Sequence, residues 1–127
     1  MSKEIKDTKR KSVFKKYGGR CAYCGCKLDD TNFNVDHINP LYRGTPQNYL
    51  NVEKGSSKIE NLNPSCYSCN SSKSTYSIEQ WRNELELKTK RLVRDSSQFR
   101  IALRFGLIKE TNTNVIFYFE KYDNWDI

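Results

Sequence analysis

The sequence has a single histidine, His37, among its 127 residues, and it has no long apolar run. No stretch approaches the roughly 18 consecutive apolar residues that mark a membrane-spanning helix, so we expect no membrane span. Residues 1–16 are charged and lack the apolar core of a signal peptide. The five cysteines are an odd number, which is untypical of a secreted disulfide framework. These absences predict a protein of the reducing cytoplasm.

The cysteines themselves have a spacing that is typical of a zinc site. Cys21 and Cys24 form one CxxC pair, and Cys66 and Cys69 form a second. Each short turn lets two thiolates converge on one tetrahedral Zn²⁺, and four sulfurs leave no open coordination position. The spacing therefore predicts a structural zinc ion. Cys26 is left over, and we interpret it as a small, partly buried residue without a redox role.

The only histidine lies between the two cysteine pairs, directly after Asp36, and Asn70 directly follows the last cysteine. A neutral imidazole can accept a proton from water near physiological pH. Asp36 and Asn70 offer oxygen ligands of the kind that Mg²⁺ and Mn²⁺ accept, and phosphodiester hydrolysis needs both a base and a cation. Plainer interpretations exist: His37 as a zinc ligand, Asp36 as a turn cap, and Asn70 as a polar residue of a first helical turn.

The positive charge is concentrated at the start of the chain. The net charge is +7, and residues 1–20 alone carry eight Lys and Arg against two acidic residues. The cluster Lys9, Arg10 and Lys11 suits phosphate neutralisation by a nucleic-acid-binding protein. The alternative is an ordinary solvated helix face.

Local signals predict an order of short elements. Glycines at 18 and 19 end a first helix, the pair Asn39-Pro40 ends a short alternating strand, and residues 42–60 have a loop composition, with a strand at 49–52 as an option. A capping box at 77–80 starts a further helix, Gly106 ends another, and an acidic tail closes the chain. The aromatic run at 115–119 favours a strand and belongs to the core rather than to a base-stacking platform. In order, the predicted elements are helix 4–17, strand 33–38, a helix that begins near 66–68 with its early turns at 70–73, a helix from 78, a helix ending at 105, and strand 115–119.

The order of these residues resembles the zinc-containing HNH endonucleases of the ββα-metal type. After the first CxxC pair come Asp36-His37-Ile38 and Pro40, and then Glu60-Asn61-Leu62-x-Pro64-x-Cys66-x-x-Cys69-Asn70-x-x-Lys73. The resemblance covers about residues 9–73. The rest of the chain is similar to small phage-type members, and the segment 44–61 is longer than is usual for the family.

The resemblance implies an α+β fold. In it, a ββα-metal finger is stapled by a four-cysteine zinc site and flanked by an N-terminal helix and by C-terminal helices plus a strand. It also implies one HNH domain over residues 1–127, with a core motif at 21–73 and an extension at 74–127. The implied location is the cytoplasm of a bacterial or phage-infected host cell.

The implied activity is metal-dependent hydrolysis of DNA. His37 would be the general base, Asp36 and Asn70 would bind a catalytic Mg²⁺ or Mn²⁺ ion, and Asn61 would fix the loop that carries the histidine. Asn61 as a plain turn residue is the alternative. Lys73 is a candidate phosphate contact, with a solvated lysine as its alternative. A competing function is a zinc-stapled module that binds DNA or a partner without cutting.

Overall fold

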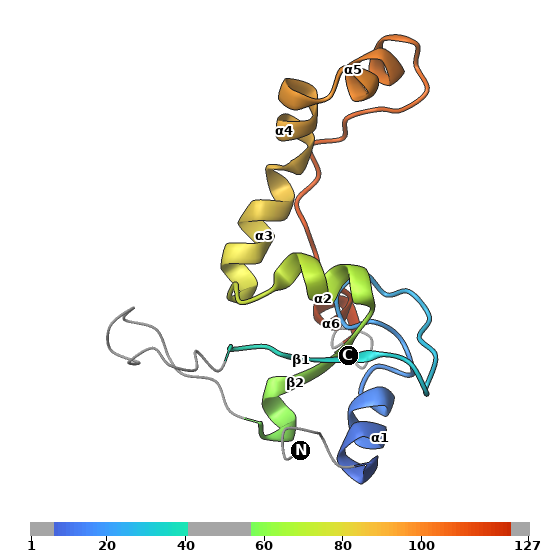
Figure 1. Cartoon of the computed structure of the whole chain (residues 1–127), viewed down its shortest axis with the longest axis vertical. Coiled ribbons are helices and arrows are strands. Elements are labelled where there is room, and N and C mark those ends of the chain that lie inside the picture. Colours follow the sequence, from blue (N-terminus) through green and yellow to red (C-terminus); the bar gives the residue numbers. More distant parts are fainter. Residues whose placement is uncertain (1–6, 41–56, 123–127) are drawn as a thin grey trace, which may run out of the picture. The chain divides into compact units, whose positions relative to one another are not determined.

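A computed structural model describes residues 7–40 and 57–122 of the chain (Figure 1). Most of the predicted loop, its optional strand at 49–52 and the acidic tail lie outside the described residues. None of the described helices is long and apolar enough to cross a membrane. The described chain divides into two compact units, of which one comprises Glu79–Val115 and the other comprises the residues before and after it. The single functional domain over 1–127 stays a prediction.

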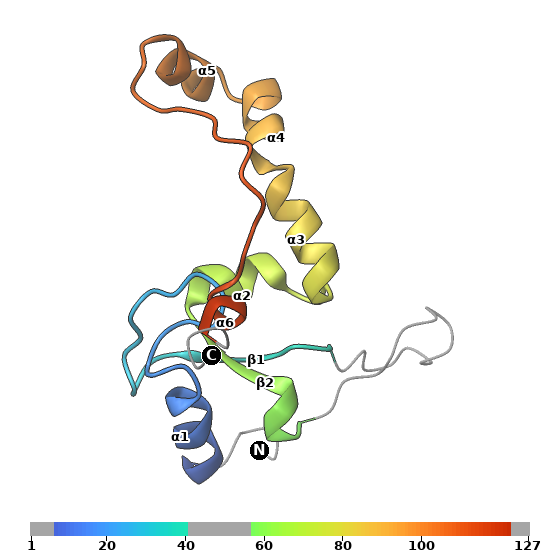
Figure 2. The ribbon, with the colours of Figure 1, turned by 180° about the vertical axis from the view of Figure 1, so that it is seen from behind.

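The first unit is built around a small two-stranded antiparallel sheet. The sheet lies between two helices, labelled α1 and α2 in Figures 1 and 2, of which α1 packs on the second strand and α2 on the first. The elements of this unit, in chain order, are α1 (Asp7–Lys15), β1 (Asn34–His37), the 3-10 turn η2 (Ile59–Asn61), β2 (Leu62–Ser65), α2 (Tyr67–Lys73) and α6 (Tyr118–Tyr122). The order strand, strand, helix confirms the predicted ββα finger.

The strand register decides which side chains of β1 become buried. Asp36 pairs with Asn63 and His37 pairs with Leu62 across the sheet. Side chains alternate along a strand, and of the β1 side chains only that of Asp36 is fully buried. Proline is tolerated on β2 because its missing N–H faces an edge, while the Pro64 carbonyl accepts a 2.9 Å hydrogen bond from the Ala22 N–H. The turn at residues 21–26, called the first cysteine turn below, is thereby fixed to β2.

The apolar core of this unit joins α1 to the sheet. Val13, Phe33 and Leu62 form its centre. The Lys16 ammonium follows α1 and donates to the carbonyl oxygens of Ile59 and Leu62, at 3.1 Å and 2.6 Å. The end of α1 is therefore tied to η2 and β2. Gly18 and Gly19 follow with positive φ angles, which confirms the predicted glycine stop.

The aromatic run at 115–119 is not a strand, so this prediction was wrong. Its backbone amides are satisfied differently: Tyr118 and Phe119 donate to the carbonyls of Tyr23 and Ala22, at 3.0 Å and 2.7 Å. The Phe117 N–H donates to a Glu120 carboxylate oxygen at 2.8 Å, as at a helix start, and α6 begins one residue later. The run docks by its amides onto the cysteine turn, and the predicted core role is confirmed for Phe117, which is 2% exposed.

The second unit is largely helical. It contains α3 (Ile78–Glu86), α4 (Lys88–Asp95) and α5 (Ser97–Arg104). The predicted helix start after Ser77 and the glycine stop at Gly106 are confirmed, since α3 begins at Ile78 and Gly106 has a φ of 73°. Ser96 caps α5 by accepting a 3.1 Å hydrogen bond from the Phe99 N–H. The returning chain is pinned to α3 because Arg82 and Glu86 both bond the backbone of Val115.

Candidate functional site

The first cysteine turn is a tight backbone loop. The Gly25 N–H donates to the Cys21 carbonyl at 3.0 Å, and the Cys21 N–H donates to the Cys26 carbonyl at 2.8 Å. Gly25 has a φ of +81°, and a Cβ atom there would lie 3.0 Å from the Tyr118 ring. Glycine is therefore favoured at this position twice, by backbone conformation and by space.

The turn gathers sulfur atoms from both cysteine pairs. The Sγ atoms of Cys21, Cys24, Cys26 and Cys66 all lie within 4.8 Å of one another, and those of Cys24 and Cys66 are 3.9 Å apart. A tetrahedral zinc ion with Zn–S bonds of about 2.3 Å needs S–S edges of about 3.8 Å. The cluster therefore has the chemistry and the size of a metal site.

Cys69 adjoins this cluster. Its backbone N–H donates to the Cys66 sulfur at 3.4 Å, and its thiol forms a hydrogen bond with Cys21. That hydrogen bond lowers the pKa of Cys21 to about 4 and raises the pKa of the Cys69 thiol. Cys26 was interpreted as partly buried and apart; it is instead exposed and belongs to the sulfur cluster. The predicted partial burial of Cys26 was therefore wrong.

Asp36 lies below the surface at the centre of the sheet. The Tyr23 hydroxyl donates to its Oδ2 atom at 2.5 Å, and the Lys73 ammonium lies 3.1 Å from the same oxygen. Burial raises the pKa of Asp36, while the charge of Lys73 and the hydrogen bond of Tyr23 act in the opposite direction. Both contacts use Oδ2, and the role of Asp36 as a cation ligand stays a prediction.

Lys73 does not lie at the surface, so its prediction as a DNA phosphate contact has to be revised. Its side chain is 0% exposed, and besides Asp36 it donates to the His37 carbonyl at 3.0 Å. A buried ammonium with an anionic and a carbonyl partner is a structural anchor. The residue joins α2 to the end of β1, and the alternative of a solvated lysine is excluded as well.

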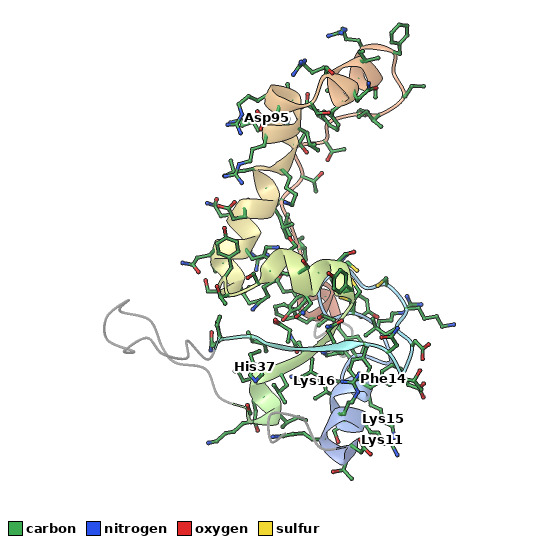
Figure 3. The ribbon with its side chains drawn as sticks, in the orientation of Figure 1. Lys11, Phe14, Lys15, Lys16, His37 and Asp95 are labelled. Atoms are coloured by element: carbon green, nitrogen blue, oxygen red, sulfur yellow. The ribbon has the colours of Figure 1, made fainter. Side chains whose placement is uncertain are left out.

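His37 is the last residue of β1, and Figure 3 shows it at that end of the strand. Its ring is half-buried, and its Nε2 atom lies 3.1 Å from the Ser57 hydroxyl. Its own carbonyl is held by Lys73.

Asn61 holds the segment that follows the histidine. Its Oδ1 atom accepts a 2.8 Å hydrogen bond from the Asn39 N–H, and its Nδ2 donates to the Asn39 carbonyl at 3.1 Å. Its carbonyl also accepts from the Ile38 N–H at 2.9 Å. These three bonds are of the kind that the family resemblance implied for Asn61; its part in catalysis stays a prediction.

Asn70 approaches the same region from α2. It lies three residues before Lys73, and residues three apart share one face of a helix. Because Lys73 bonds Asp36, that face of α2 is turned toward β1. Asp36 and Asn70 thus come from two elements that pack together, and their role as cation ligands stays a prediction.

The three N-terminal basic residues differ in their surroundings. Lys9 donates to the Ser57 carbonyl, while Arg10 donates to the Phe33 carbonyl and lies 4.1 Å from the centre of the Phe33 ring. The guanidinium of Arg10 is therefore partly engaged by Phe33 within the fold. Lys11 is exposed, as is Lys15, and both lie along α1 in Figure 3. They border a hollow of about 410 Å³ lined by Asp7, Arg10, Lys11, Phe14, Lys15, Asp30, Thr31 and Phe33.

Two contacts of the site were missed from the sequence. Tyr23 was given no role from the sequence, although an aromatic hydroxyl in a buried turn needs a polar partner. Ser57 could not be predicted as the partner of His37, since the two residues lie 20 positions apart in the chain.

A two-stranded sheet, a following helix, a cysteine cluster beside them and an Asp-His pair on the first strand together define a ββα-metal finger. Residues 21–75 match the family model for HNH endonuclease. This segment, less than half of the chain, is what the protein shares with the HNH endonucleases.

Two individual proteins share this similarity. The chain is 36% identical over 72 residues to the SPbeta prophage-derived putative HNH endonuclease YoqL of Bacillus subtilis (strain 168), a match that covers 53% of this chain and 28% of that protein. The chain thus matches less than a third of the length of this relative. The crystal structure of the Type II-C Cas9 enzyme from Actinomyces naeslundii is similar at 25% identity with a TM-score of 0.49, over 62% of this chain and 7% of that one. That likeness is too partial to add to the match of residues 21–75.

Proposed function

We propose that this chain is a metal-dependent DNA endonuclease that hydrolyses phosphodiester bonds, with His37 as general base and one divalent cation. The observation that carries the proposal is the shared anchoring of the two central residues. Lys73 holds the carboxylate of Asp36 and the carbonyl of His37, while Asn61 fixes the backbone just after them. A binding module without activity would have no need of a base and a carboxylate held in this way.

The residues have distinct parts in the proposed reaction. The half-buried imidazole of His37 accepts a proton from the attacking water, and Ser57 orients its ring through Nε2. Asp36, through Oδ1, and Asn70 would hold Mg²⁺ or Mn²⁺. When bound, that cation supplies the positive charge that stabilises the phosphoryl oxygens and the departing alkoxide. The sulfur cluster would hold Zn²⁺ as a structural ion.

DNA as the substrate is supported by two basic sets of residues. The first is the α1 set with Lys9, Arg10 and Lys11. The second lies in residues 88–109, which carry seven Lys and Arg against a single acidic residue, Asp95. Four of the seven are exposed and have no ion-pair or hydrogen-bond partner among the described residues: Lys88, which lies near the carboxylate of Glu84, and Lys90, Arg104 and Lys109. Such charges suit phosphate contacts, which are not specific for sequence.

The setting that we propose is the cytoplasm of a bacterial or phage-infected cell. The prophage origin in the name of YoqL supports it.

The test of the proposed function is plasmid cleavage by the His37→Ala variant. We expect cleavage in Mg²⁺ or Mn²⁺ to fall by about a hundredfold or more, because general-base catalysis contributes on that scale. Bound zinc, DNA binding and the circular dichroism spectrum should be unchanged. Ser71→Ala, at an exposed position of the same helix α2, is the control and should cut normally. Cleavage at the wild-type rate by His37→Ala would refute the assignment and favour the binding module.

A further inference from the structure

The sulfur cluster holds more thiols than a tetrahedral ion can bind. Four cysteines make two CxxC pairs, yet Cys26 is one of the four whose sulfur atoms all lie within 4.8 Å of one another. Cys69 touches the same cluster through Cys21 and Cys66. Five thiols therefore surround a site with four coordination positions.

Cys26 is held beside the site by the fold. Its carbonyl accepts the Cys21 N–H at 2.8 Å, and the turn at Gly25 leads the chain back past the first pair. Its thiol adjoins those of Cys24 and Cys66. The position of Cys26 is thus fixed by the same turn that presents the zinc ligands.

We propose that Cys26 is a fifth, interchangeable ligand of the structural metal, able to take the position of Cys69. The inference rests on the proposed zinc site but not on the proposed cleavage reaction. Cys21, Cys24 and Cys66 are common to both ligand sets, and the fourth position alternates between Cys26 and Cys69. In the exchange one Zn–S bond forms and one breaks, and the proton released by the Cys26 thiol is taken up by the Cys69 thiolate, so no oxidant or reductant is needed.

The two exchanging cysteines differ in what they anchor. Cys69 lies on α2, directly before Asn70, while Cys26 lies in the first cysteine turn. When Cys26 occupies the fourth position, α2 is bound to the metal through Cys66 alone. Cys66 stays essential in both states, and it also caps α2 by accepting the Cys69 N–H.

The test compares the zinc content of full-length Cys→Ser variants after dialysis against a chelator, measured by elemental analysis. Cys69→Ser and Cys26→Ser should each retain one zinc per chain, with affinity within about tenfold of wild type. Cys66→Ser and the double variant Cys26→Ser/Cys69→Ser should bind zinc at least about a hundredfold more weakly, because only three thiolates remain in one ligand set.

Cobalt substitution tests the ligand set in a single variant, so the result does not depend on whether the double variant folds. The Cys69→Ser protein loaded with Co²⁺ should show the sulfur-to-cobalt absorption of a four-thiolate site, which only Cys26 can complete when Cys69 is absent. A Cys69→Ser protein as depleted of zinc as Cys66→Ser would overturn the inference, and so would a double variant that keeps its zinc. Since the readout is metal content, a failure here is distinguishable from a failure of DNA cleavage.

Discussion

At the scale of single residues, the site depends on one buried ion pair. Lys73 and Asp36 have side chains that are 0% and 6% exposed, so neither charge is solvated by water. A buried charge without its partner is costly, which is why the pair has to be considered as a unit. Lys73 is in this sense a positioning residue: it touches the carboxylate and the His37 carbonyl, and it does not reach the surface.

We therefore expect Lys73→Met to destabilise the protein by about 3–5 kcal/mol, because it leaves the carboxylate of Asp36 buried and unpaired. The free energy of unfolding from denaturant titration measures this. The double variant Lys73→Met/Asp36→Asn should recover much of the loss, since no charge is then left behind. A Lys73→Met protein within about 1 kcal/mol of wild type would contradict the buried pair.

At the scale of elements, the cysteine turn carries a strong local constraint. Gly25 and Gly18 both have positive φ, at +81° and +66°, but only Gly25 faces a neighbouring ring. Gly25→Ala should therefore cost more stability than Gly18→Ala. The second substitution pays only the left-handed backbone strain of roughly 1–2 kcal/mol, while the first also forces Tyr118 to move.

The comparison of these two variants by thermal and denaturant unfolding isolates the contact with α6. Equal losses in both would show that Tyr118 does not press on the turn. A larger loss in Gly25→Ala, together with weaker zinc retention, is the expected result.

Local signals predicted most elements of the first unit. Glycines at the end of α1 and the Asn39-Pro40 pair after β1 each act through neighbours in the chain, and the predicted helix start near 66–68 agrees with α2. The aromatic run before α6 was misassigned because strand propensity reflects the surroundings, and its amides bond the distant cysteine turn. The same holds for the site. Spacing in the sequence indicated His37, Asp36 and the cysteine pairs. The partners of Lys73 could not be predicted, because Lys73 and His37 are 36 residues apart in the chain and meet only in the fold.

At the scale of the whole molecule, the basic residues are the feature that bears on DNA. Replacing Lys90, Arg104 and Lys109 by Gln should weaken DNA binding and reduce its salt dependence, by about one slope unit for each phosphate contact that is lost. Arg94→Gln is the control, because Arg94 already pairs with Asp95 at 2.7 Å and should contribute less. Fluorescence anisotropy across a salt series measures both slopes. Unchanged slopes in the triple variant would remove the residues of α4, α5 and the following turn from the DNA surface.

The most direct test of the account is a divalent-metal titration of DNA cleavage, with the bound zinc counted in parallel. In the wild-type protein, mild chelation should abolish cleavage, leave the zinc in place and allow rescue by Mg²⁺ or Mn²⁺. In Asp36→Ala and Asn70→Ala the zinc count should be unchanged, while rescue should require much more metal or fail. A wild-type activation curve in both variants would contradict the account, because the catalytic cation would then have to bind elsewhere.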